Sequence, residues 1–288
     1  MQLGLIGLQM KIRPKFSLKL LMALFVILAA LLASWVLPTL EQMRICDTGM
    51  IGAYSQLESK SELPAWKQAV ASCFGEHSVR KVIAVEIQPE YEFTVEDIRT
   101  FRHLKRLTIG GSDPVACGCD AIGQLGKLQR LSFERSGQLG NVSSFAKLVD
   151  LEKIELYQTR FDSGGSVLGR LPKLRLAHLR DCTLDQQQFD GIANSDSIQT
   201  LWIRIGPDLD LKKLWEMDQL LELGISRHDG WNNISPVLKL TNLSTLNLDN
   251  TFAKELPILK QLKQRGITGT YLDRLREIQD DRRLLFSD

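Results

Sequence analysis

A pattern of apolar residues at the first, fourth and sixth positions of a short segment recurs eight times along the chain. The eight segments begin at Val82, Leu104, Leu128, Leu151, Leu174, Ile198, Leu220 and Leu243. Their starts lie 22 to 24 residues apart, a regularity that scattered leucines would not produce. Each segment therefore predicts a short strand that turns alternate side chains inward.

A second apolar pair, six and three residues before each segment from the second onward, follows the same period. The pairs are Ile98/Phe101, Ile122/Leu125, Phe145/Leu148, Leu168/Leu171, Ile192/Ser195, Leu214/Met217 and Val237/Leu240. A spacing of three is helical, so each unit should be a strand, a turn and a short helix or 3₁₀ turn. After the eighth strand, Ile258, Leu259 and Leu262 predict another outer helix, and residues 266–272 fit a ninth edge strand whose register is open.

Residues 174–184, LRLAHLRDCTL, show the repeat most completely. They resemble the leucine-rich repeat consensus at its spaced positions, which are Leu174, Ala177, Leu179, Cys182 and Leu184. The resemblance covers residues 78–272 and implies an α/β fold: a right-handed, arc-shaped solenoid of eight or nine repeats. It places parallel strands on a concave face and helical segments on a convex face. It also implies that Cys182 faces inward and that partners bind the concave face.

The N-terminal region contains an uncharged apolar run at residues 20–37. As a helix it rises roughly 27 Å, close to the hydrocarbon thickness of a bilayer. Lys11, Arg13, Lys15 and Lys19 precede it, and the first acidic residue is Glu41. By the positive-inside rule, residues 1–17 are cytoplasmic, 18–38 form a transmembrane signal anchor, and the repeats lie outside the cytoplasm.

Residues 16–21, FSLKLL, also resemble the anchors of many planctomycete membrane proteins. Two other interpretations of the run are a signal peptide cleaved near Ala33, which Leu31 at the minus-three position disfavours, and a buried core helix. Translation starts either at Met1 or at Met10, which is followed by a basic segment.

Residues 39–77 lack the repeat and are expected to form a helical cap or linker. Their helical rhythm is strongest after Pro64, and Gly75 lies just past the expected helix end. Such a cap covers the apolar face that an end repeat would expose. Outside the cytoplasm, Cys46 and Cys73 at the two ends of this region could pair as a disulfide. Residues 273–288 form a charged C-terminal tail.

Chemistry beyond binding has little support in the sequence. The formal net charge of +2 gives no bulk field for nucleic acid. The chain has no phosphate loop, nucleophile elbow, metalloprotease or dinucleotide motif, and its four histidines are scattered. Cys117 and Cys119 lack a second ligand pair or a nearby His. No catalytic residue, metal site or cofactor is therefore expected.

Positions three, five and seven of each strand should face outward. On this register we predict a continuous partner-binding patch formed by Tyr157, His178, Arg180, Trp202 and Arg204. A secondary basic row is predicted from Arg106, Arg130 and Lys153. Exposed Trp, Tyr and Arg are typical of a binding hot spot, although Arg that stacks on aromatic rings merely to cover a sheet has the same composition.

These features favour a membrane-anchored, non-catalytic protein that binds another protein, or a glycan, at the cell envelope. The alternative is a structural, membrane-associated scaffold without a specific ligand. A surface aromatic at position 202 would favour binding, and a wholly packed patch would favour the scaffold.

Overall fold

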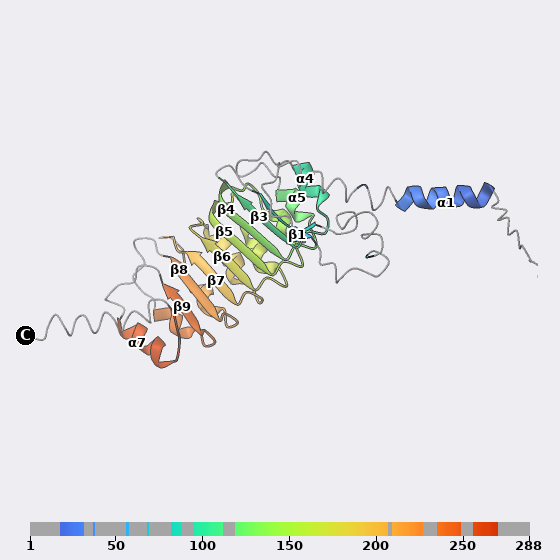
Figure 1. The fold of residues 1–288 in the computed structure, drawn as a ribbon. Helices are drawn as coiled ribbons and strands as arrows, with labels where there is room; N and C mark the ends of the chain where they lie inside the picture. Colours follow the sequence, from blue (N-terminus) through green and yellow to red (C-terminus); the bar gives the residue numbers. More distant parts are fainter. Residues whose placement is uncertain are drawn as a thin grey trace, which may run out of the picture.

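A computed structural model describes residues 18–31, 37, 56–57, 68, 82–87, 95–111, 119–206, 209–226, 235–248 and 256–269. Within these residues nine strands form one sheet, in which each strand pairs with its neighbours in the sequence (Figure 1). They are β1 (Gln56–Leu57), β2 (Val82–Ile87), β3 (Arg106–Gly110), β4 (Arg130–Gln138), β5 (Lys153–Arg160), β6 (Leu176–Arg180), β7 (Thr200–Arg204), β8 (Glu222–Ser226) and β9 (Thr245–Leu248). From β2 to β9 every pairing is parallel, which confirms the expected α/β solenoid.

Short helical segments follow the strands and cover one face of the sheet (Figure 1). They are α4 (Val95–Thr100), α5 (Cys119–Gly123), η4 (Ser143–Lys147), η5 (Gly165–Arg170), α6 (Gln186–Ala193), η6 (Lys212–Glu216), η7 (Ser235–Lys239) and α7 (Leu256–Gln264). Four of them, η4 to η7, are 3₁₀ turns, as the three-residue spacing of their apolar pairs allows.

The core lies between this helical layer and the sheet, and the repeated apolar positions fill it. Leu107, Leu131, Ile154 and Leu201 are all at most 1% exposed. The helical pairs six and three residues before each strand are buried as well, and together they form one continuous cluster. Because each repeat buries its leucines against its neighbours, the stack is stable only as a unit.

Ser195, which breaks the apolar pattern, is also buried, at 2% exposure. Its hydroxyl accepts hydrogen bonds from the backbone N–H groups of Ser197 and Ile198, both at 3.3 Å. The Ser195 hydroxyl therefore stabilises the turn before β7 through hydrogen bonds that a leucine side chain could not form.

The ninth position of the repeat carries a buried polar side chain in three successive units. The hydroxyl of Ser136 donates to Ile109 O at 3.2 Å, and the thiol of Cys182 donates to Leu156 O at 3.4 Å. Between them, Thr159 is completely buried and donates to Tyr157 O at 3.1 Å. These side chains satisfy backbone carbonyls where the chain leaves the strand. Burial raises the pKa of Cys182 to about 12, so its thiol stays protonated.

The N-terminal side of the sheet departs from the helical cap expected for residues 39–77. Gln56 and Leu57 form β1, which pairs antiparallel with β2, so the helical expectation is wrong at these two residues. The physical reason is that β2 would otherwise leave the hydrogen-bonding groups of a sheet edge unpaired. Gln68 is helical, and the remaining residues of 39–77 lie outside the described residues.

The expected membrane span at residues 18–38 is described only at α1 (Leu18–Leu31) and at Leu37. Among the helices that the structure describes, none combines the length and apolarity needed to cross a bilayer. Several large apolar side chains of α1 are exposed, with Phe25 at 70% and Val26 at 63%.

The opposite end of the stack is closed by α7, where Leu259 and Leu262 are completely buried. The outer helix expected after the eighth strand is thus confirmed. The strand of the eighth repeat is β9, and residues 266–272 were expected to add one more strand beyond it. Thr268 forms only an isolated parallel bridge with Thr245 of β9.

Candidate binding site on the open face of the sheet

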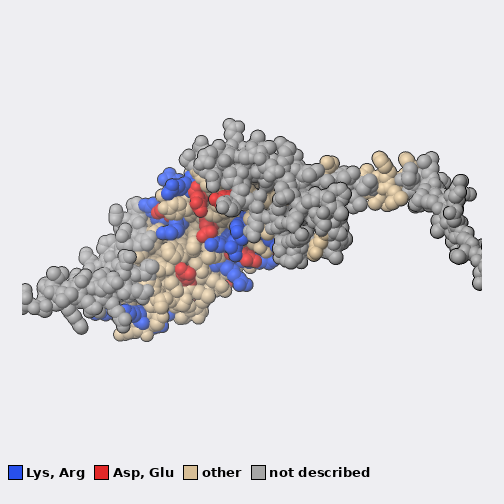
Figure 2. Space-filling view, viewed as in Figure 1, with Lys and Arg blue, Asp and Glu red and all other residues tan. Residues whose placement is uncertain are grey.

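The face of the sheet opposite the helical segments is called the open face. It carries positions three, five and seven of each repeat, counted from the segment starts Leu104, Leu128, Leu151, Leu174, Ile198, Leu220 and Leu243. Position five, for example, runs across the strands as Thr108, Ser132, Glu155, His178, Trp202, Gly224 and Asn247. Figure 2, in the same view as Figure 1, shows charges of both signs around the middle strands and a largely uncharged surface towards β9.

The five predicted site residues lie on three neighbouring strands, β5 to β7. Tyr157 is the register partner of Arg180, and His178 is the register partner of Trp202. Arg204 lies two residues beyond Trp202 and pairs with Ser226 on β8. The set is called the open-face patch below. Its continuity matches the expected register, while binding by these residues stays a prediction.

Trp202 extends across β8 rather than projecting into solvent. A Cβ atom built on Gly224 would lie 2.2 Å from Trp202 Cδ2, so only glycine leaves room for this ring. The indole Nε1–H donates to Glu222 Oε1 at 3.1 Å, and Asn247 Nδ2 donates to the same oxygen at 3.3 Å. The ring is thus held in one orientation by sterics and by a hydrogen bond.

Two side chains of β6 complete the surroundings of the indole. The ring centroids of His178 and Trp202 are 5.4 Å apart with a tilt of 57°. The guanidinium carbon of Arg180 lies 5.3 Å from the indole centroid, within range of a cation–π interaction. Trp202 remains half-buried. It is therefore neither the fully exposed aromatic that would favour binding nor part of the wholly packed patch that would favour the scaffold.

The histidine of the patch is neutral near pH 7. Burial lowers the pKa of His178 from its usual 6.5, and the nearby Glu155 carboxylate opposes this shift only in part. His178 Nδ1 lies 3.5 Å from Glu155 Oε1, a carboxylate that Lys153 also approaches at 3.1 Å. His178 therefore contributes an aromatic, uncharged surface to the patch.

Arg204 points to the strand end. Its Nη1 lies 3.6 Å from Asp181 Oδ1, and the two side chains are 41% and 38% exposed. Exposed pairs of this kind contribute little to stability. Asp181 has a φ of 56°, in the left-handed region, as do Arg135 and Gln158 at the equivalent place in the two preceding repeats. The left-handed turn places the carboxylate where it can orient the guanidinium.

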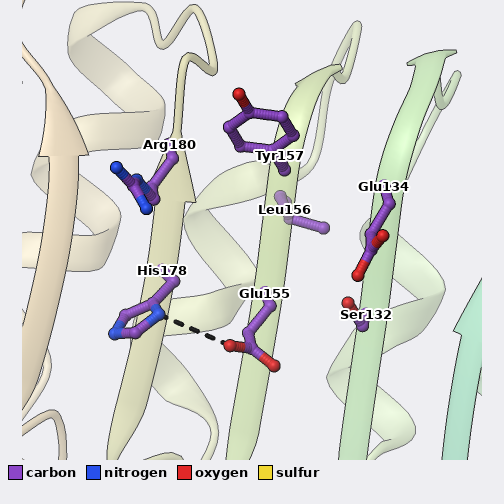
Figure 3. Close-up of a pocket in the computed structure, with 7 residues that line it drawn as sticks. All are labelled: Ser132, Glu134, Glu155, Leu156, Tyr157, His178 and Arg180. Atoms are coloured by element: carbon purple, nitrogen blue, oxygen red, sulfur yellow. Dashed lines mark ion pairs between the residues drawn. The ribbon is translucent and has the colours of Figure 1, made fainter.

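A depression with a volume of about 300 Å³ lies beside the patch (Figure 3). It is lined by Ser132, Glu134, Glu155, Leu156, Tyr157, His178 and Arg180. Ser132, Glu134 and Glu155 were not among the predicted site residues. They occupy positions five and seven of β4 and β5, so the register that selected Tyr157 and His178 would also have selected them. A preference for aromatic and basic residues left them out.

The basic row is present as a register ladder. Arg106 pairs with Arg130, and Arg130 pairs with Lys153. Lys153 is neutralised by Glu155 at 3.1 Å. Arg106 and Arg130 are exposed, and neither has an ion-pair partner among the residues that the structure describes.

The described part of the chain holds no group of three or more metal-binding side chains. Cys119 is buried and unbridged, and desolvation raises the pKa of its thiol. Cys46, Cys73 and Cys117 lie outside the described residues, so the disulfide between Cys46 and Cys73 stays a prediction.

No protein-family model and no curated protein matches the sequence. Solved structures do. Internalin C2 from Listeria monocytogenes is 19% identical with a TM-score of 0.47, and the match covers 65% of this chain and 93% of that chain. An internalin (InlF) from the same organism is 15% identical with a TM-score of 0.42, over 64% and 62%. The Drosophila Toll–Spätzle complex gives 15% identity and a TM-score of 0.47, over 63% of this chain and 25% of that chain.

Proposed function

We propose that this protein is a non-catalytic, membrane-anchored binding protein that recognises a protein partner through the open-face patch. The observation that carries the proposal is the arrangement of Trp202. Its indole is held over Gly224, hydrogen-bonded to Glu222 and flanked by Arg180, yet it is only half-buried. An aromatic side chain that is already ordered loses little conformational entropy when a partner covers it.

The chemistry of the neighbours indicates what the partner presents. The guanidinium of Arg180 lies over the indole, and Arg204 lies two residues beyond Trp202 on the same strand. A guanidinium binds carboxylates in a bidentate manner. A partner surface with an apolar side chain beside one or two carboxylates would complement this arrangement. Such clusters of Trp and Arg supply most of the affinity in many protein interfaces.

The anchor is the second part of the proposal. The exposed apolar side chains of α1 and the basic residues that precede it support a single-pass signal anchor with a cytoplasmic N-terminus. The repeats then lie outside the cytoplasm. A C-terminal reporter that is active only in the cytoplasm should stay silent, whereas the same reporter at the N-terminus should be active. Strong C-terminal activity would contradict this topology.

Site-specific photocrosslinking tests the binding function. A photoreactive amino acid at position 157 should crosslink a defined partner in intact cells. The same amino acid at position 212, an 85% exposed side chain on the helical side, is the matched control and should not. Equal crosslinking from both positions, or none, would contradict binding by the patch and favour the scaffold. Crosslinking to a glycan would show that the partner is a glycan and not a protein.

A further inference from the structure

The turns that lead into the strands stack along one side of the solenoid. The backbone N–H groups of Gln129, Glu152 and Arg175 each donate to the carbonyl of the equivalent residue one repeat earlier, at 2.8 to 2.9 Å. Further along, Asn242 Nδ2 donates to Asp218 O in the preceding turn at 2.7 Å. These bonds align successive turns into a continuous rim.

The rim is strongly basic in four neighbouring repeats. Segments 99–106, 126–130, 147–153 and 170–176 hold eleven Lys or Arg residues against two acidic residues, a formal net charge of +9. These cations, called the basic rim, are Arg99, Arg102, Lys105, Arg106, Lys127, Arg130, Lys147, Lys153, Arg170, Lys173 and Arg175. All of them are exposed except Lys153, which is half-buried. The whole chain carries only +2, so this charge is local.

Part of the charge is neutralised locally, and Lys153 pairs with Glu155 at 3.1 Å. Asp150 accepts ion pairs from both Lys173 at 2.7 Å and Lys127 at 3.8 Å. The only other acid of these segments is Glu152. Concentrating like charges on one rim lowers stability through self-repulsion, and nothing in the core requires it. An anionic surface that covers the rim would remove that cost.

The next two turns of the same rim, 194–200 and 216–222, have the opposite sign, and the last turn, 239–245, carries only Lys239. Segments 194–200, 216–222 and 239–245 hold four acidic residues and one lysine, a formal net charge of −3. The four basic turns also precede the last three turns in the sequence, so they lie closer along the chain to α1. A chain tethered through α1 would present its basic repeats to the bilayer at high effective concentration, while the acidic repeats would be repelled.

We infer that the basic rim docks on the anionic lipid headgroups of the bilayer that holds α1. Docking fixes the tilt of the solenoid and leaves the open-face patch free for its partner. The inference rests on the proposed anchor. Each Lys or Arg near an anionic membrane surface strengthens the attraction about fivefold, and salt screens it. Docking should therefore require anionic lipid and low or moderate ionic strength.

The test uses the full chain reconstituted into phosphatidylcholine vesicles with and without phosphatidylglycerol. Flotation with the neutral vesicles reports the anchor alone. The acylation rates of individual lysines, read by mass spectrometry, report docking. Lys105 and Lys147 should react several-fold more slowly on anionic vesicles, and high salt should abolish the difference. Lys239, Lys260 and Lys263, which are exposed at the far end of the stack, are internal controls and should be unaffected.

Charge reversal sharpens the test. The triple variant Lys105→Glu, Lys147→Glu and Arg175→Glu should lose the lipid dependence, read at Lys127 and Lys173. The matched variant Lys239→Glu, Lys260→Glu and Lys263→Glu should keep it. Equal lysine reactivity on both vesicles in a chain that floats would overturn the docking and leave the anchor intact. Failure to float would instead overturn the anchor. Protection by soluble duplex DNA but not by anionic vesicles would assign the rim to nucleic acid and overturn the inference.

Discussion

Position four of the repeat holds an apolar residue on every strand from β3 to β9, and each of these residues is at most 1% exposed. Position five, its neighbour in the chain, points to the open face and changes chemistry at every step. Across β4 to β8 it is Ser, Glu, His, Trp and Gly. The buried face packs against equivalent residues of the neighbouring repeats, so its apolar residues recur in every repeat. The other face has no such requirement, so its individual side chains are free to serve a partner.

The largest expected effect comes from breaking the repeating face. Leu179 is completely buried between its neighbours. Leu179→Ala should lower the free energy of unfolding by about 2–5 kcal/mol, because it removes buried apolar area and leaves a cavity. Chemical denaturation of the full chain in detergent measures this. Arg180→Ala, on the same strand but on the open face, is the control. Equal losses in the two variants would contradict the division between the faces.

A substitution on the open face should lower the free energy of unfolding by a similar amount only where side chains are tightly packed. Gly224→Ala places a methyl group 2.2 Å from the Trp202 ring. Overpacking of this kind costs about 1–3 kcal/mol, and here the indole should be displaced. Gly126→Ala is the control, since its Cβ would meet no atom within 4 Å. Near-UV circular dichroism and denaturation should change for Gly224→Ala only. An unaltered spectrum would mean that Trp202 does not lie over β8.

A smaller effect is expected from acidification. The pKa of His178 is lowered in the folded state, so the unfolded chain binds a proton first as the pH falls. The stability from neutral His178 is fully present above about pH 6.5, the unfolded value, and is lost as the pH falls through the folded value. His178→Gln should therefore lose less stability than the wild type between neutral and mildly acidic pH. Parallel pH dependences in both proteins would show that His178 is not desolvated.

The division between the faces also explains how far the sequence could predict the structure. Leucine spacing specified the parallel strands and outer helices, because the period records contacts between neighbouring repeats. The two-residue strand β1 could not be predicted, because it forms by pairing with the free edge of β2 and is too short to show an alternation of apolar and polar residues. Ser195 looked like a break, yet its hydroxyl serves the following turn.

The candidate site was predictable only in part. The register placed Tyr157, His178 and Trp202 on neighbouring strands, because register is a property of the repeat. The role of Gly224 as the space for the indole could not be predicted, since it depends on the rotamer of Trp202. The same holds for Asp181, whose left-handed backbone brings its carboxylate to Arg204.

The most direct test of the proposed function is a titration of the crosslinked partner, once purified, against three variants. Trp202→Ala and Arg204→Ala should each weaken binding by about 2 kcal/mol or more, roughly a thirtyfold rise in Kd. Lys212→Ala, on the helical side, should bind like the wild type. Thermal melts of each variant must confirm folding. Arg204→Ala is the cleaner variant, because its side chain is 41% exposed and its loss leaves only an exposed Asp181 unpaired. Unchanged affinity in well-folded Trp202→Ala and Arg204→Ala proteins would contradict partner binding by the open-face patch.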